Sequence, residues 1–433
     1  MNNRTLHYII RFLLGEDIPE EIVAAIGYTT NRKLYDRYSV VIVPSGFFDN
    51  HIYGTTDSMP ELPLQEIEGT PLLFGTPKLE QVGDTLVIHA DIIASTYFFI
   101  TRYEEIIQRH ERDEHGRFPG KKSLLYRAGF LHRPIVDEYR LLLRNWLKQY
   151  GLRIPETNKQ IQKIYLTHDL DAPTLYRSWK GIIRSLKDGR GLIKSIQGKC
   201  GPIEEDPYYT FPWIFEQNET FRKQVGKVSC QSILFVRSGG KCKQDKPHYS
   251  LQSEDMCKLI QTVLANDMAI GLHSSYQAGM APELIKKEKA GLEKSTGKEI
   301  RSNRHHYLGC REPEDMTYLE AAGITDDFTM GYADVAGFRL GTSYPVRWIN
   351  PVNRRLSSIR LHPLVIMDRS LEEKKYMGLS FDEALAYCLD LVKNIRNVGG
   401  ELTLLWHNSS IAEGSDSYLR YLYARFLNEL AKK

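Results

Sequence analysis

The stretch KIYLTHDLD, residues 163–171, decides the fold class and points to the chemistry. Its apolar first half predicts a buried β-strand, and Asp169 and Asp171 stand where that strand ends. Side chains two residues apart in a strand point to the same side, so we expect the two carboxylates to lie together. Because like charges repel, one carboxylate suits a bound cation and the other a free base. The structural alternative is a helix-capping Asp and a turn Asp before Pro173.

Beyond this strand, short apolar runs alternate with amphipathic helical patterns up to the end of the chain. This alternation is typical of βα units around a parallel sheet or barrel. Seven strands are predicted, at residues 163–169, 228–236, 268–273, 299–306, 324–329, 358–367 and 401–407. We therefore expect an α/β fold over residues 159–433, an irregular (β/α) barrel of about seven parallel strands. A capping box, Ser380 with Glu383, predicts the start of one of its helices.

The preceding part, residues 1–158, has a different pattern. Short β-rich runs such as SVVIVPSGFF (39–48) alternate with turns, and EYRLLLRNWLKQYG (138–151) has apolar residues at helical spacing. This part is predicted to be a small α+β domain of unknown role. The polar stretch RIPETNKQ (153–160) marks the expected boundary.

Histidines stand at three other predicted strand ends. They are His273, His305 with His306, and His407. The carboxyl ends of parallel barrel strands meet on one face, so residues far apart in the sequence converge there. A single histidine in such a place is more often structural, but several strand ends with acid/base residues favour one hydrolytic, metal-binding site.

Four short motifs resemble a known family. THDLD (167–171), GLHSS (271–275), NRHHY (303–307) and LLWHN (404–408) follow one another in the order of the polysaccharide deacetylases, the NodB-homology group of carbohydrate esterase family 4. This resemblance implies an irregular barrel of about seven βα units. The whole chain also resembles an uncharacterised bacterial set of deacetylase-like proteins with an extra N-terminal domain, which gives no substrate.

The resemblance also implies roles for individual residues. Asp169 would be the general base, Asp171 and His273 metal ligands, and His407 the general acid, while Arg304 would orient Asp169. The cofactor would be a divalent ion, zinc above all, with cobalt or nickel also compatible with mixed N/O ligands. For Arg304, a surface ion pair is the structural alternative.

The sequence departs from the family pattern at one metal ligand, after the motif GLHSS (271–275). The second metal histidine of the family falls at Gln277, and glutamine is a poor zinc ligand. His305 or His306 could replace it, and one of them would still be a packing residue. If neither does, the metal would be weak or absent.

Further residues are candidates for substrate contacts. The glycine-rich loop GYADVAGFRLGTS (331–343) could line a sugar cleft, although a purely structural loop fits equally well, and it lacks the phosphate-loop pattern. The candidate substrate-binding residues are Ser275, Tyr276, Tyr332, Arg339 and Trp406. The basic stretch 177–199, in which Asp188 is the one acid, could form an amphipathic helix that contacts a membrane surface or acidic glycans. Its alternative is a barrel-covering helix with a solvated face.

Composition excludes some classes. With 57 Lys and Arg against 54 Asp and Glu, the net charge of +3 indicates no nucleic-acid partner. The six cysteines are scattered and predict reduced thiols. We find no signal peptide or apolar stretch of membrane-spanning length, so a soluble cytoplasmic protein is expected. The oligomeric state is left open.

Three functions follow as hypotheses. The first is a metal-dependent amidase or esterase that removes acetyl groups from a glycan or glycan precursor. The second is a non-catalytic relative that binds carbohydrate or a partner protein, which Gln277 would favour. The third is another barrel hydrolase such as a glycosidase, which requires two carboxyl groups roughly 5 to 10 Å apart across an open cleft.

Overall fold

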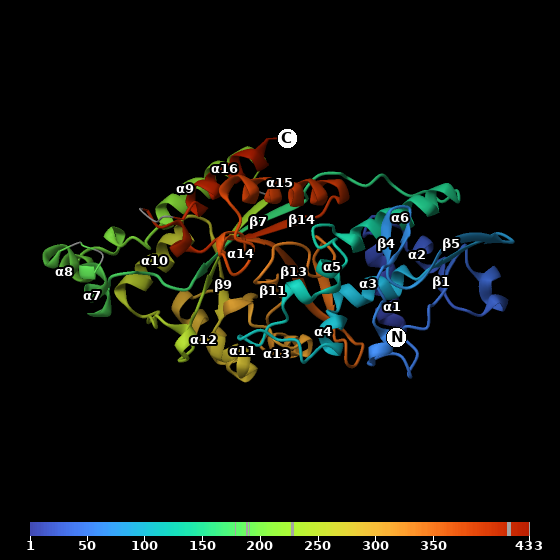
Figure 1. The fold of residues 1–433 in the computed structure, drawn as a ribbon, viewed down its shortest axis with the longest axis horizontal. Helices are drawn as coiled ribbons and strands as arrows, with labels where there is room; N and C mark the ends of the chain where they lie inside the picture. The colour runs from blue at the N-terminus through green and yellow to red at the C-terminus, as the bar shows by residue number, and fades with distance from the viewer. Residues whose placement is uncertain (178, 188, 190, 227–228, 414–416, 433) are drawn as a thin grey trace.

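The structure is a computed structural model of the chain. It describes residues 1–177, 179–187, 189, 191–226, 229–413 and 417–432. The molecule is elongated: the N-terminal part lies at one end, the barrel in the middle, and the helices α7 and α8 at the other end (Figure 1).

The N-terminal part contains a four-stranded sheet of order β1-β2-β6-β5. Its strands β1 (Ile26–Tyr28), β2 (Val40–Ile42) and β6 (Thr85–Ala90) run parallel, and β5 (Gly75–Val82) is antiparallel to β6. A separate hairpin pairs β3 (Gln65–Ile67) with β4 (Thr70–Leu72). The helices are α1 (Asn3–Leu14), α2 (Glu20–Ala24), α3 (Ile92–Ile100), α4 (Tyr103–Ile107), α5 (Leu124–Arg127) and α6 (Ile135–Gln149). The expected α+β region is confirmed.

The second part is a closed barrel of seven parallel strands. They are β7 (Lys163–Leu170), β8 (Cys230–Val236), β9 (Ala269–Ser274), β10 (Ser302–His305), β11 (Asp326–Met330), β13 (Leu356–Met367) and β14 (Glu401–Leu405). The ring runs β7-β8-β9-β10-β11-β13-β14 and returns to β7, because β11 pairs with β13 and β14 with β7. The predicted (β/α) barrel is confirmed, although most strand bounds differ by one to three residues from the prediction and Val228 lies outside the described residues.

One strand was not predicted. The short β12 (Val346–Ile349) pairs antiparallel with the first half of β13 and lies outside the parallel ring. Four residues are too few for a periodic signal, and β13 supplies the partner that makes them a strand.

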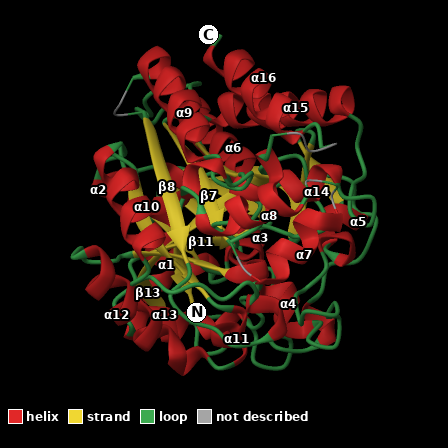
Figure 2. Cartoon of the chain, turned by 90° about the vertical axis from the view of Figure 1, so that its left-hand side faces the viewer, coloured by secondary structure: helices red, strands yellow, loops and turns green. Residues whose placement is uncertain are grey.

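Helices surround the strands, as Figure 2 shows. They are α9 (Phe211–Val225), α10 (Glu254–Ala265), α11 (Tyr276–Met280), α12 (Ile285–Thr296), α13 (Met316–Ala321), α14 (Asp368–Glu372), α15 (Phe381–Val398) and α16 (Leu419–Ala431). The capping box before α15 is present: Glu383 accepts from the backbone N–H of Ser380 at 2.9 Å. No helix of the described residues is long and apolar enough to cross a membrane.

The basic stretch 177–199 forms two helices and not one. These are α7 (Trp179–Lys187) and α8 (Leu192–Cys200), which pack against each other. Gly189 and Gly191 between them adopt positive φ angles of 74° and 75°, a conformation that interrupts a helix. Asp188 and the side chain of Trp179 lie outside the described part of the chain.

The N-terminal part packs on the barrel through buried polar contacts. Arg339 of the barrel donates to both carboxylate oxygens of Glu105 at 3.0 and 2.9 Å, and Asp137 accepts from the backbone N–H of Ser343 at 2.8 Å. One apolar core cluster includes residues of both parts. The division between residues 158 and 159 stays a prediction.

Candidate active site

Four strands deliver polar side chains to one pocket at the carboxyl end of the barrel. Asp169 and Asp171 come from the end of β7, His273 from the end of β9, His306 follows β10, and His407 follows β14. All five line a pocket of about 270 Å³. The strand-end pattern of the sequence therefore corresponds to spatial convergence.

Asp171, His273 and His306 form a group that could hold a metal ion. The Nε2 atoms of His273 and His306 lie 3.1 and 3.4 Å from the same Asp171 Oδ1 atom. One ligand atom from each residue lies within 4.8 Å of the others. Burial opposes the ionisation of Asp171, but the three neighbouring imidazoles, with His306 first, hold its pKa well below the usual value. An ionised carboxylate with two imidazoles is a donor set typical of catalytic zinc.

The outer partners of both imidazoles contact Nδ1, so Nε2 is the nitrogen directed toward Asp171. The His273 Nδ1 atom lies 2.9 Å from the carbonyl oxygen of Arg304, and the His306 Nδ1 atom 3.0 Å from Asp245 Oδ1. Such acceptors hold the proton on Nδ1 and fix the ring orientation. Burial lowers the pKa of His306, which favours the neutral, ligating form. The residues present thus fit a divalent ion.

The two candidates for the third ligand are separated by the structure. His306 belongs to the group, whereas His305 is turned toward Asn303 and Thr329, at 3.1 and 3.4 Å from its Nδ1 atom. Burial lowers the pKa of His305 to about 3, as expected for a neutral packing residue. Gln277 lies apart and accepts from the backbone N–H of Lys241 at 2.9 Å.

Arg304 holds Asp169 from inside the barrel. Its Nη1 atom donates to Asp169 Oδ1 at 3.0 Å and to Thr167 Oγ1 at 2.7 Å. The guanidinium is fully buried and lies 4.5 Å from the ring centroid of Phe235. A buried charge of this kind needs a charged partner, so Arg304 fixes one oxygen of Asp169 and leaves the carboxylate at the pocket wall.

His407 is oriented by Asp368, a residue that was not predicted from the sequence. Asp368 accepts from the backbone N–H of His407 and contacts its Nδ1 atom, both at 2.8 Å. The Nε2 atom faces the pocket, 3.7 Å from Asp171 Oδ2. Burial alone would lower the pKa of His407, but Asp368 and then Asp171 raise it to about 8. Asp368 directly follows the predicted strand 358–367, so the rule used for the other strand ends could have found it.

The five predicted substrate-binding residues do not line this pocket. Ser275 caps α11 and donates its hydroxyl proton to Glu288, and Tyr276 packs against His115 and Arg311. Trp406 is buried and donates to the carbonyl oxygen of Leu419 at 3.2 Å. Tyr332 lies under Arg339, which itself binds Glu105. These residues have structural contacts that a local motif cannot reveal.

Other residues complete the lining of the pocket. Arg117 comes from the N-terminal part and donates to the carbonyl oxygen of Tyr307 at 2.8 Å. Tyr307 and Leu308, directly after His306, both adopt positive φ angles, of 60° and 52°. Non-glycine residues rarely adopt this conformation, and strained backbone of this kind gathers at functional sites. The remaining lining residues include Gln244, Lys246, Arg369, Glu373, Lys375 and Tyr376.

The chain matches a family model in its N-terminal part and is similar to a solved structure. Residues 2–151 match the model of a family described as "Family of unknown function (DUF7033)". No curated protein matches the chain. The chain is similar to a crystal structure described as that of a "putative polysaccharide deacetylase from Mycobacterium smegmatis", at 14% identity and a TM-score of 0.40, over 65% of this chain and 87% of that chain.

Proposed function

We propose that the barrel is a metal-dependent hydrolase that removes N- or O-linked acetyl groups from a glycan or glycan precursor. One observation carries this proposal: a three-residue metal-ligand group shares a pocket with a carboxylate bound by Arg304 and an imidazole bound by Asp368. A ligand set, a base and an acid are the three parts used in metal-dependent hydrolysis of an amide or ester. The motif resemblance to the polysaccharide deacetylases supports the same reaction.

Asp171, His273 and His306 would hold the ion, with zinc expected and cobalt or nickel as alternatives. When bound, such an ion lowers the pKa of water and polarises the acetyl carbonyl group. Each imidazole keeps its orientation through its Nδ1 partner, which limits the reorganisation that binding would require.

The protein's own groups account for the proton transfers. Asp169, held by Arg304, takes a proton from the water whose oxygen bonds to the acetyl carbon. The bond from that carbon to the sugar nitrogen or oxygen then breaks, and His407 donates its Nε2 proton to the departing atom. Asp368 keeps His407 protonated and turned toward the pocket, because its carboxylate stabilises the imidazolium. The products are acetate and the deacetylated sugar.

The two other hypotheses have less support. A non-catalytic relative was favoured by Gln277, but His306 stands where a third ligand is needed. A glycosidase requires two carboxyl groups without an ion between them. Here Asp169 is bound by Arg304, and Asp171 is surrounded by imidazoles.

The proposal is tested by measuring acetate release from a panel of N- and O-acetylated glycans and monosaccharides. We expect release that requires added zinc, cobalt or nickel and stops with a chelator. Asp171→Asn removes a ligand charge, so both metal binding, measured by calorimetry, and acetate release should be lost. Acetate release that is indifferent to the chelator, or release of reducing ends in place of acetate, would contradict the proposal.

A further inference from the structure

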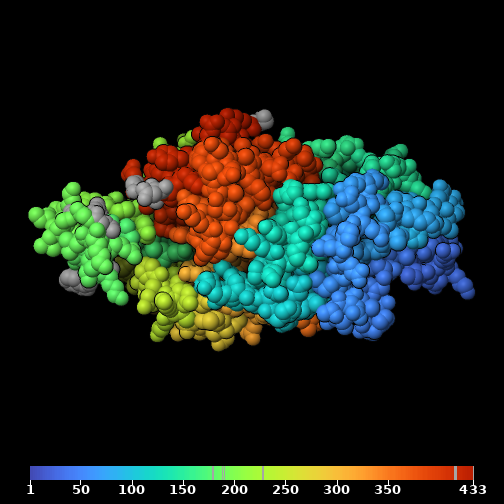
Figure 3. All heavy atoms as spheres, in the orientation of Figure 1, coloured from blue at the N-terminus to red at the C-terminus, as the bar shows by residue number. Residues whose placement is uncertain are grey.

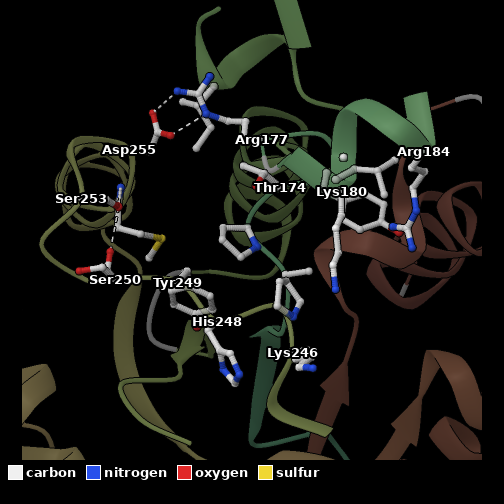
Figure 4. Close-up of a pocket in the computed structure, with 18 residues that line it drawn as sticks. Thr174, Arg177, Lys180, Arg184, Lys246, His248, Tyr249, Ser250, Ser253 and Asp255 are labelled. Atoms are coloured by element: carbon white, nitrogen blue, oxygen red, sulfur yellow. Dashed lines mark hydrogen bonds and ion pairs between the residues drawn. The ribbon is translucent and has the colours of Figure 1, made fainter. Parts of the chain in front are cut away.

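A second pocket adjoins the candidate active site. It has a volume of about 720 Å³ and lies between α7 and the segment 246–256 (Figure 4). Its wall begins with Ala172, the residue after Asp171, and Lys246 lines both pockets. A ligand that fills this space therefore lies next to the metal-ligand group.

Basic side chains line this second pocket. Lys180 and Arg184 come from α7, and Lys246 and His248 from the facing segment. Figure 4 shows Lys180 reaching from α7 toward Lys246 and His248. Within the described residues none of these four forms an ion pair with a carboxylate, whereas Arg177 at the edge is paired with Asp255 at 2.6 Å.

The segment that carries Lys246 is fixed to the end of β7. Tyr249 donates its hydroxyl proton to the carbonyl oxygen of Leu170 at 2.8 Å. Arg237 donates to the carbonyl oxygens of both Asp171 and Pro247, at 3.3 and 2.7 Å. Lys246 and His248 are thus held in place beside the active site.

Unpaired cations that face one space repel each other, and a bound anion relieves this repulsion. A phosphate group suits such a site because it carries a charge of about −1.5 to −2 at neutral pH and three acceptor oxygens. Lysine and arginine donors bind phosphate through charge-assisted hydrogen bonds. A single carboxylate would neutralise only one of these cations.

We infer that the second pocket binds the phosphate or pyrophosphate group of a glycosyl phosphate, while the acetyl group of the same sugar lies in the metal pocket. This inference rests on the proposed function and specifies its substrate class: an acetylated sugar that carries a phosphate ester. Lys246, at the junction, contacts the phosphate from the side of the active site.

Calorimetry of the full chain with inorganic phosphate and with pyrophosphate, at constant ionic strength and without added metal, tests the anion site. We expect saturable binding that Lys180→Ala with Arg184→Ala weakens at least about tenfold, since two charge-assisted contacts are lost. Lys187→Ala is the matched control, because Lys187 is an exposed lysine of the same helix outside the pocket. Asp171→Asn should bind phosphate as the unmodified chain does, which separates this pocket from the metal site.

No binding by the unmodified chain, or equal weakening by Lys187→Ala, would overturn the inference. Circular dichroism shows whether the double variant folds. If it does not, the single variant Lys180→Ala takes its place and should also bind phosphate more weakly than the unmodified chain. A change in phosphate affinity by Asp171→Asn as large as that caused by the double variant would place the anion at the metal site and overturn it too.

Acetate release separates this inference from the proposed function. We expect kcat/KM to be higher for N-acetylglucosamine 1-phosphate than for N-acetylglucosamine, and the double variant to remove this difference. Equal rates for the two sugars overturn the substrate class and leave the hydrolase intact. No acetate release from any sugar overturns the proposed function, while the phosphate site is still decided by calorimetry.

A separate observation concerns the outer surface of α7 and α8. Five large apolar side chains are exposed there: Ile183 (58%), Leu186 (42%), Leu192 (60%), Ile193 (75%) and Ile196 (48%). Lys187 and Lys194 stand among them, and the described residues of 177–200 include no acidic side chain. Figure 3 shows this helix pair projecting at the end of the molecule remote from the N-terminal part. We name this surface the α7–α8 tip.

We propose that the α7–α8 tip docks on the surface of an anionic lipid bilayer. Apolar side chains would enter the boundary of headgroups and acyl chains while the lysines contact anionic headgroups. The charge of the tip is complementary to such a surface, and its apolar side chains have no other partner among the described residues that buries them.

Co-sedimentation with vesicles tests the docking. We expect the full chain to bind vesicles of phosphatidylcholine with phosphatidylglycerol, and phosphatidylcholine alone only weakly. Leu192→Ser with Ile193→Ser should weaken binding at least about tenfold, because two apolar side chains leave the bilayer. Val352→Ser is the matched control, since Val352 is 59% exposed on another part of the surface.

Equal binding of the double variant and the control would overturn the docking proposal, as would no binding to anionic vesicles. Light scattering supplies a further test. A dimer that the double variant dissociates would show that a second copy of the chain covers the tip, which also overturns it.

Discussion

The two ends of the barrel hold similar pairs in different surroundings. At the carboxyl end, His407 contacts Asp368 at 2.8 Å, and its other nitrogen faces the pocket. Toward the amino end, His362 of β13 contacts Asp326 at 2.9 Å, but its ring is stacked on Phe328 with centroids 4.3 Å apart. Both imidazoles are raised in pKa by carboxylates. Both pairs consist of a histidine and an aspartate, so the residue types do not distinguish them. The comparison shows that a histidine is a candidate acid when its ring reaches a cavity, and part of a structural ion pair when its ring is buried against other side chains.

The largest effect is expected on kcat, at the pair of His407 and Asp368, whose imidazole faces the pocket. His407→Gln removes the proton donor, and we expect kcat for acetate release to fall by about 10² to 10⁴-fold. Metal affinity should change far less than kcat, because His407 is not part of the ligand group. Steady-state kinetics and metal calorimetry on the same preparation check both values.

Asp368→Asn is the companion variant, since it keeps the shape but removes the charge that stabilises the imidazolium. A His407→Gln enzyme with unchanged kcat would remove His407 from the mechanism and erase the difference between the two barrel ends.

The next largest effect is expected on the free energy of unfolding, at the pair of His362 and Asp326, whose imidazole is buried. His362→Gln leaves Asp326 and Glu401 without their buried partner, and we expect the free energy of unfolding at pH 6 to fall by about 3 kcal/mol. Arg360→Gln is the control, because Arg360 is 58% exposed and its contact with Asp326 contributes about 0–1 kcal/mol. Denaturant titrations check both variants.

The stability from this pair depends on pH with a definite sign. Burial alone lowers the pKa of His362, but Asp326 and Glu401 raise it above its usual value. The histidine's contribution is therefore complete below its unfolded pKa of about 6.5 and is lost as the pH rises through the higher folded value. The pKa of Asp326 is lowered to about 2, so its contribution is lost only as the pH falls through that value. An effect of His362→Gln that is larger at pH 9 than at pH 6 would show this assignment to be wrong.

The smallest effect is expected on metal affinity, at a residue that contacts a proposed ligand but is not itself one. Asp245→Asn weakens the acceptor for His306 Nδ1, and we expect metal affinity to fall about 10 to 100-fold. Gln277→Ala should leave it nearly unchanged, because Gln277 binds the backbone of Lys241. Competition with a metal-sensitive dye measures both. Equal losses in the two variants would mean that Gln277 contributes to the ion after all.

Much of the fold could be predicted because it depends on local patterns. The seven parallel strands and the capping box at Ser380 follow from periodicity and residue type. The strand β12 and the break between α7 and α8 were missed, since the first depends on pairing with β13 and the second on the backbone of Gly189 and Gly191.

The candidate site divides in the same way. That Asp169, Asp171, His273 and His407 share a pocket could be expected from their places at strand ends. The choice between His305 and His306 could not, because it depends on which ring faces Asp171 once the chain leaves β10. Arg339 could not be assigned either, because its partner Glu105 lies 234 residues away in the sequence.

Local residue order was thus enough for the strands, their direction and the polar groups at their ends, because alternation and strand polarity act over a few residues. The partners of those groups were decided only when the chain folded. Asp245 and Asp368 orient two imidazoles, and Arg117 reaches the pocket from the N-terminal part. Basic side chains that form no ion pair within the described part of the chain gather around the second pocket. Electrostatic and packing contacts of this kind join segments that are remote in sequence, so no local pattern encodes them.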